Sequence, residues 1–163
     1  MSTAPESRGN ETLPGLLRLL GARAHQVRAA TRAADHYLAQ DAQDEHDTGA
    51  WLLASAVTLA ADLAADLDGL SRTLKERSAE PALQQRLVAL RAQAHQLHAA
   101  AKAADRFLEQ DARDDRDTGG WLVPMAQQLA TRLAAGLDDT LAAARRPAAA
   151  DKATAAEPRR AAA

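Results

Sequence analysis

The sequence contains one 32-residue segment twice, and this duplication limits what the chain can fold into more than any other feature. His25 corresponds to His95 and Trp51 to Trp121, an offset of 70 positions. Between residues 22–53 and 92–123, 19 of 32 positions are identical, and most of the others are mild exchanges. Internal similarity of this kind indicates that one structural unit is built twice. We therefore expect a molecule with two equivalent halves.

Each half has two stretches in which apolar residues recur every three or four positions, the spacing of one face of an α-helix. In the first half these residues are Leu13, Leu17, Leu20, Ala24, Val27, Ala34 and Leu38, followed by Leu52, Ala56, Leu59, Leu63, Leu67, Leu70 and Leu74. The pattern predicts helices over about 13–43 and 49–77, a third that begins near Pro81 and a fourth after residues 117–119. Asp47, Thr48 and Gly49, like residues 117–119, are interpreted as a turn that caps the following helix.

The two halves predict an all-α protein, an up-down-up-down four-helix bundle made of two tandem-duplicated helical hairpins. Each hairpin has one apolar face that it cannot bury alone. The composition agrees with this fold. Hydrophobic residues make up 47% of the chain, enough for a core, whereas aromatic residues, which are enriched in β-strands, make up only 2%. We expect the bundle over residues 12–146, with hairpins over 12–77 and 81–146, a disordered leader over 1–11 and a disordered tail over 147–163. Pro124 replaces Ala54 of the first half, and we expect it to delay or kink the fourth helix.

Charge and residue content exclude several classes of function. The formal net charge is −2, with 20 Lys and Arg against 22 Asp and Glu, so the chain has no excess of basic charge with which to neutralise phosphates, and we expect no nucleic-acid binding. No cysteine is present, which excludes disulfides, thiolate metal sites and cysteine nucleophiles. The first residues do not resemble a secretory signal, and no run approaches the roughly 20 apolar residues of a membrane helix. We therefore expect a cytoplasmic protein without membrane contact.

Two histidines and two aspartates are predicted to lie at matching levels of the bundle. In an antiparallel hairpin, residues at equal height have numbers with a constant sum, which places His25 opposite Asp68 and His95 opposite Asp138. The favoured interpretation is one His–Asp ion pair in each hairpin, at the rim of the core. The alternative is a shared site for a divalent metal such as zinc, formed by these four residues, with His98 one turn above His95.

The hairpin tips are rich in carboxylates, which favours helix capping or, alternatively, a calcium or magnesium patch or a surface for a basic partner. The residues assigned to capping and to the structure of the tips are Asp41, Asp44, Asp47, Thr48 and Trp51, with Asp111, Asp114, Asp117, Thr118 and Trp121 in the second half. The aromatic pairs Trp51/Trp121 and Tyr37/Phe107 lie near these tips. We expect them to fill that end of the core, the alternative being the floor of a small-molecule pocket.

A stripe of charged residues steps by three and four positions along the first and third helices. This charged stripe consists of His25, Arg28, Arg32 and Asp35, with His95, His98, Lys102 and Asp105 in the second half. Such a stripe is typical of a salt-bridged face, and it is also the best candidate for binding a protein partner or a small anionic ligand.

The residues together indicate binding and not catalysis. No arrangement typical of a catalytic site can be argued from the sequence, and no cofactor is indicated other than the divalent metal of the alternative. The sequence therefore predicts a non-catalytic binding or regulatory module, whose partner is a protein or a small ligand, and its helical pattern also allows a homodimer. The alternative function is a divalent-metal-binding protein with a His/Asp site between the two hairpins.

Overall fold

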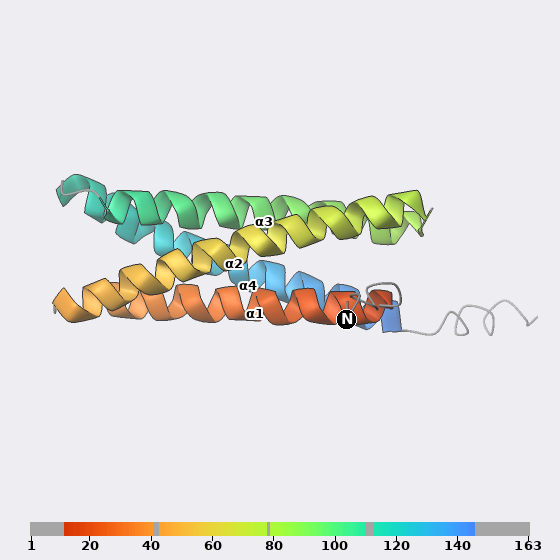
Figure 1. Ribbon diagram of the computed structural model, residues 1–163, viewed down its shortest axis with the longest axis horizontal. Coiled ribbons are helices and arrows are strands. Elements are labelled where there is room, and N and C mark those ends of the chain that lie inside the picture. Colours follow the sequence, from red (N-terminus) through yellow and green to blue (C-terminus); the bar gives the residue numbers. More distant parts are fainter. Residues whose placement is uncertain (1–11, 41–42, 78, 110–112, 146–163) are drawn as a thin grey trace, which may run out of the picture.

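Four long helices make up the part of the chain that the structure, a computed structural model, describes: residues 12–40, 43–77, 79–109 and 113–145. The helices are α1 (Leu13–Leu38), α2 (Gln43–Glu76), α3 (Pro81–Leu108) and α4 (Arg113–Arg145). α1 and α3 each pack against both α2 and α4, and helices that follow one another in the chain run antiparallel (Figure 1). The predicted all-α four-helix bundle is confirmed.

The core repeats in the same way as the sequence. Leu17 and Leu63 of the first hairpin, α1 with α2, are completely buried, and so are Leu87 and Leu133 at the equivalent places of the second hairpin, α3 with α4. Full burial of one such side chain stabilises the fold by about 1.5–3 kcal/mol. Because each hairpin has one apolar face, packing of the two faces against each other explains why the chain closes into a bundle.

A smaller apolar cluster fills the core at the end where both hairpins turn back (Figure 1). Its buried members are Ala34, Leu53, Ala104 and Val123, with Leu38, Leu52, Leu108 and Leu122 packed against them. This tip cluster takes two residues from each hairpin at equivalent positions. Leucine, valine and alanine therefore occupy the place where the aromatic side chains were expected.

The two Asp-Thr-Gly sequences lie inside helices, so the predicted turns are wrong. α1 ends at Leu38, earlier than the predicted residue 43, and α2 already begins at Gln43. Thr48 donates its hydroxyl proton to the backbone carbonyl of Asp44 over 2.8 Å, one turn back within α2, and so does not cap that helix. Gly49 is buried where a Cβ atom would lie only 2.8 Å from Cγ of Leu38. Glycine serves here to bring two helices close together, not to turn the chain.

The remaining helix ends follow the sequence signals in part. Pro81 is the first residue of α3, where its missing amide proton costs nothing, and α2 ends near the predicted position. α4 begins at Arg113 and continues through Pro124, so the predicted delay is wrong. The helix is already established several turns before the proline, and burial of Val123 and Ala126 on either side offsets the lost hydrogen bond. The predicted leader and tail, Asp41 and Asp111 lie outside the described residues.

One helix has the length and composition that a membrane span requires, in contrast to the sequence prediction. The stretch lies within Asp44–Glu76 and has a mean hydropathy of 1.5. In the bundle, however, Leu53, Leu63 and Leu67 of this helix are completely buried in the core. A core helix rich in leucine and alanine meets the same criteria as a membrane span, so this stretch is weak evidence for membrane insertion.

Candidate functional site

Each repeated histidine contacts an aspartate that belongs to the other hairpin. Nε2 of His25 on α1 lies 3.0 Å from Oδ2 of Asp138 on α4. Nε2 of His95 on α3 lies 3.2 Å from both carboxylate oxygens of Asp68 on α2. The predicted pairs, His25 with Asp68 and His95 with Asp138, therefore have the wrong partners. The predicted level is right, because each histidine meets an aspartate at the height where one was expected.

The handedness of the bundle explains the exchange of partners. Each of the four polar residues directly follows a buried core residue, so all four project from the same side of their apolar stripes; the core residues are Ala24, Leu67, Ala94 and Leu137. In an antiparallel bundle, equivalent sides of neighbouring helices face each other. Whether they meet within a hairpin or between hairpins depends on the hand with which the helices are arranged. Residue spacing determines height but not this hand.

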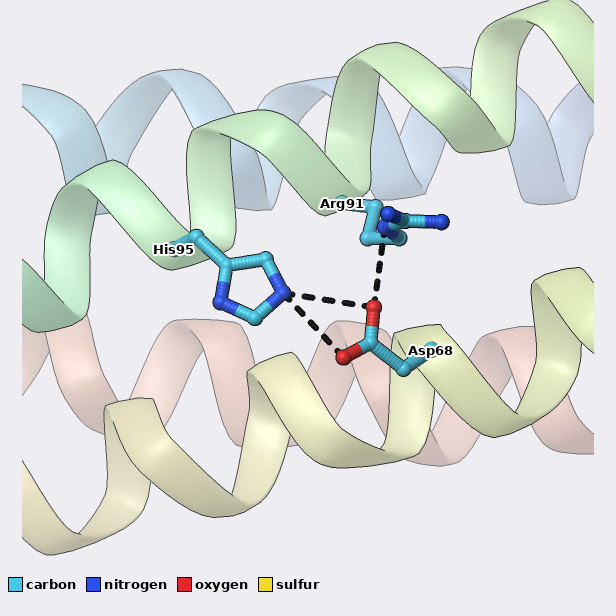
Figure 2. A network of polar contacts seen from close by, with 3 residues as sticks. All are labelled: Asp68, Arg91 and His95. Atoms are coloured by element: carbon cyan, nitrogen blue, oxygen red, sulfur yellow. Dashed lines mark hydrogen bonds and ion pairs between the residues drawn. The ribbon is translucent and has the colours of Figure 1, made fainter.

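The pair on α2 and α3 has a third member. Arg91 donates from Nε to Oδ1 of Asp68 over 2.9 Å, so one carboxylate bridges an arginine and a histidine of the neighbouring helix (Figure 2). The position equivalent to Arg91 in the first hairpin is Gly21, whose Cβ would lie 3.5 Å from Oδ1 of Asp138. The two sites are thus related in position but differ in charge.

These contacts orient the hairpins and contribute modestly to stability. The histidine and aspartate side chains are between about a third and a half exposed, and an ion pair at such a position contributes about 0–1 kcal/mol. A further ion pair joins Arg23 of α1 to Asp66 of α2 within the first hairpin. The favoured interpretation from sequence, ion pairs at the rim of the core, fits these exposures.

The four residues predicted to share a metal ion do not come together. One pair joins α1 to α4 and the other joins α2 to α3, on opposite sides of the bundle. Within the described ranges, no group of three or more His, Asp and Glu side chains could hold a metal ion. The shared site of His25, Asp68, His95 and Asp138 is therefore not formed in this arrangement.

The charged stripe includes both histidines of the contacts between hairpins, and its other members lie along the same helices. Arg28, Arg32 and Lys102 are exposed, whereas Asp35 and Asp105 are half-buried. Burial raises the pKa of Asp105 above its ordinary value, and the nearby carboxylate of Glu109 adds to this effect. The lysine and the arginines of the stripe are therefore directed to solvent, and its two aspartates lie closer to the core.

The tryptophans are exposed, so the prediction that they fill the core at the tips is wrong. Trp51 is 69% exposed and Trp121 is 81% exposed, and Met125, one turn after Trp121, is also exposed. The reason is the phase of α2, because Trp51 lies two positions before the completely buried Leu53. Two positions rotate a helix by about 200°, which directs the indole away from the core.

Carboxylates share the helix face of the first tryptophan. Asp44 and Asp47 are exposed and precede Trp51 by two turns and one turn of α2. Asp44 lies in the first turn of α2, where a negative charge is favourable, as expected. In the second hairpin the structure describes only the backbone of residues 113–117, while Thr118 is exposed inside α4. The tip of the first hairpin thus presents an aromatic side chain beside negative charge.

Sequence reasoning missed one feature, a groove between α3 and α4. It has a volume of about 500 Å³ and lies between the segments 86–93 and 132–143. A signal for it was available in the sequence, because several bulky residues of the first half are replaced by small ones at the equivalent positions of the second.

Comparison with known proteins identifies no relative of this chain. No family model matches the chain, and neither the curated proteins nor the solved structures contain a match.

Proposed function

We propose that the chain is a non-catalytic binding module that holds a partner at the tip end of the bundle. The observation that carries the proposal is the exposure of both tryptophans, Trp51 at 69% and Trp121 at 81%. Tryptophan is enriched in binding surfaces and costs solubility when it is left exposed. Since the sequence retains it at equivalent positions of both halves, the molecule has two copies of the same contact.

The surroundings of Trp51 indicate the chemistry of the partner. Asp44 and Asp47 lie on the same exposed face of α2, so a partner that presents basic side chains next to apolar ones fits this surface. A guanidinium group can also stack on an exposed indole ring. We therefore infer a protein partner with a basic, amphipathic segment, which the duplicated tips of a cytoplasmic module would hold at two points.

Fluorescence titration tests this function because the chain has only two tryptophans. The Trp51→Phe and Trp121→Phe variants each leave one indole as a reporter of its own tip. The probe is a peptide of alternating arginine and leucine, and a peptide of alternating arginine and serine is its control for charge alone. We expect the arginine–leucine peptide to shift the emission of both variants to shorter wavelength and the control peptide to do so far less.

Exposed apolar residues at the other end of the molecule provide a matched control. Leu19 and Val88 are each 56% exposed, so the Leu19→Ala/Val88→Ala variant removes comparable surface away from the tips. Binding, measured by calorimetry, should be lost in Trp51→Ala/Trp121→Ala and kept in the control variant. Equal binding by both variants would contradict a contact at the tips. Selective loss in Arg32→Glu/Lys102→Glu would instead assign binding to the charged stripe.

A further inference from the structure

The groove between α3 and α4 exists because the two hairpins have diverged at equivalent positions. It is lined by Arg86, Ala89, Leu90, Gln93, Arg132, Gly136, Asp139, Thr140, Ala142 and Ala143. The first hairpin has Leu19 and Leu70 where the second has Ala89 and Thr140, so bulk has been lost on both walls. Comparison of equivalent positions in the two hairpins therefore shows which residue exchanges accompany the groove.

The floor of the groove has also lost an ion pair. Arg23 and Asp66 bridge α1 and α2 in the first hairpin, and the equivalent residues of the second are Gln93 and Gly136. The Oε1 atom of Gln93 is buried and has no hydrogen-bond partner among the described residues. A buried amide without a partner is unfavourable, so a polar molecule toward which the amide can turn would be stabilising.

The walls of the groove have gained positive charge. Arg86 replaces Leu16 and Arg132 replaces Asp62, and neither arginine forms an ion pair with a residue that the structure describes. Asp139, which replaces Gly69, adds one carboxylate to the lining of the groove. Two guanidinium groups without ion pairs select an anion, and the carboxylate requires that the same molecule also carry a hydrogen-bond donor.

We propose that this groove binds a small carboxylate that carries a hydroxyl or amino group, with its carboxylate groups on Arg86 and Arg132 and its donor directed to Asp139 and Gln93. The volume of about 500 Å³ suits a molecule of this size. The proposal does not depend on partner binding at the tips, because the groove lies on other residues, in the part of α3 and α4 remote from Trp121.

Calorimetric titration of the full chain with malate and with succinate tests the proposal. Both probes are dicarboxylates, and only malate carries the hydroxyl donor. We expect malate to bind and succinate to bind about tenfold more weakly, the effect of one lost charge-assisted hydrogen bond. Glutamate, a dicarboxylate whose donor is an amino group, is a third probe, and failure of both malate and glutamate to bind would overturn the proposal. Equal binding of malate and succinate would overturn the role of Asp139 and Gln93.

Variants that restore residues of the first hairpin locate the site. Arg86→Leu and Arg132→Asp should each weaken malate binding about tenfold or more. Ala89→Leu should weaken it by filling the groove without a change of charge. Arg72→Leu, which removes an exposed arginine on α2, is the matched control and should bind malate like the unchanged protein. Far-UV circular dichroism verifies that each variant is folded, and equal affinity of all four variants would assign any binding to another surface.

Discussion

Replacement of Gly49 by alanine tests whether this residue serves the close packing of α1 against α2. The added Cβ would lie 2.8 Å from Cγ and 2.9 Å from the backbone nitrogen of Leu38, closer than atoms in real structures approach. Overpacking of this kind costs about 1–3 kcal/mol. Alanine in a helix interior is favoured over glycine by about 1 kcal/mol, which opposes the cost. The expected net result is a destabilisation of about 0–2 kcal/mol.

Gly69 is the matched control, because it lies within the same helix and a Cβ there would meet nothing within 4 Å. Gly69→Ala should therefore keep the helical gain and raise the free energy of unfolding by about 0.5–1 kcal/mol. The two variants of α2 should thus differ by about 1–3 kcal/mol, the packing term alone.

Urea unfolding followed by circular dichroism measures both variants against the unchanged protein. The neighbouring residues Gly119 and Gly120 repeat the comparison within α4. A Cβ on Gly119 would lie 2.9 Å from Cγ of Leu108, whereas one on Gly120 would meet nothing within 4 Å. If Gly49→Ala stabilised the protein as much as Gly69→Ala, the close approach of α1 and α2 next to their connecting segment would be refuted.

Three further outcomes follow from the polar contacts. Asp68→Asn removes a carboxylate with two partners, whereas Asp138→Asn removes one whose ion-pair partner among the described residues is a single histidine. Asp68→Asn should therefore be less stable by up to about 1 kcal/mol in urea unfolding, and added salt should reduce the difference. Because the pKa of Asp105 is raised above its ordinary value near 3.8, its contribution is most favourable at acidic pH and is lost as the pH rises through the folded pKa; Asp105→Asn should therefore gain stability relative to the unchanged protein between acidic and neutral pH. Since the described His and Asp side chains form separate pairs, a chelator should leave the melting temperature unchanged, and a fall would restore the metal alternative.

Residue periodicity was sufficient to predict the bundle because the chain repeats one strong apolar pattern four times. Leucine and alanine at spacings of three and four leave little choice but helices, and short links leave little choice but antiparallel neighbours. The start of α3 was also predictable, because Pro81 has one favourable place in a helix.

The errors at the tips arose where tertiary packing overrides a local sequence signal. Asp-Thr-Gly is typical of a turn when neighbouring residues alone are considered, but glycine is equally suited to a tight helix crossing. Only tertiary packing against Leu38 distinguishes the two uses. The location of the tryptophans was wrong for a related reason: the predicted stripe of α2 included Leu52, next to Trp51, whereas the structure buries Leu53, two positions after Trp51.

The His–Asp contacts were only half predictable for a different reason. Antiparallel geometry determines the height of His25, and the structure agrees with it. The choice between Asp68 and Asp138 depends on the hand of the bundle, which a pattern of apolar and polar residues does not encode. The groove was overlooked because it arises from differences between the halves, such as Ala89 for Leu19, and not from their similarity.

The exchange of partners across the two hairpins has a consequence for how such a molecule can be assembled. Both His–Asp bridges between described residues link one hairpin to the other. A single hairpin therefore carries a histidine and an aspartate that do not pair with each other in this arrangement. Two identical hairpins would satisfy both bridges at once through a twofold axis, as in an isologous dimer. Joining them in one polypeptide retains that geometry and frees each half from the constraint of symmetry, which is the condition under which Gly21 and Arg91 can differ.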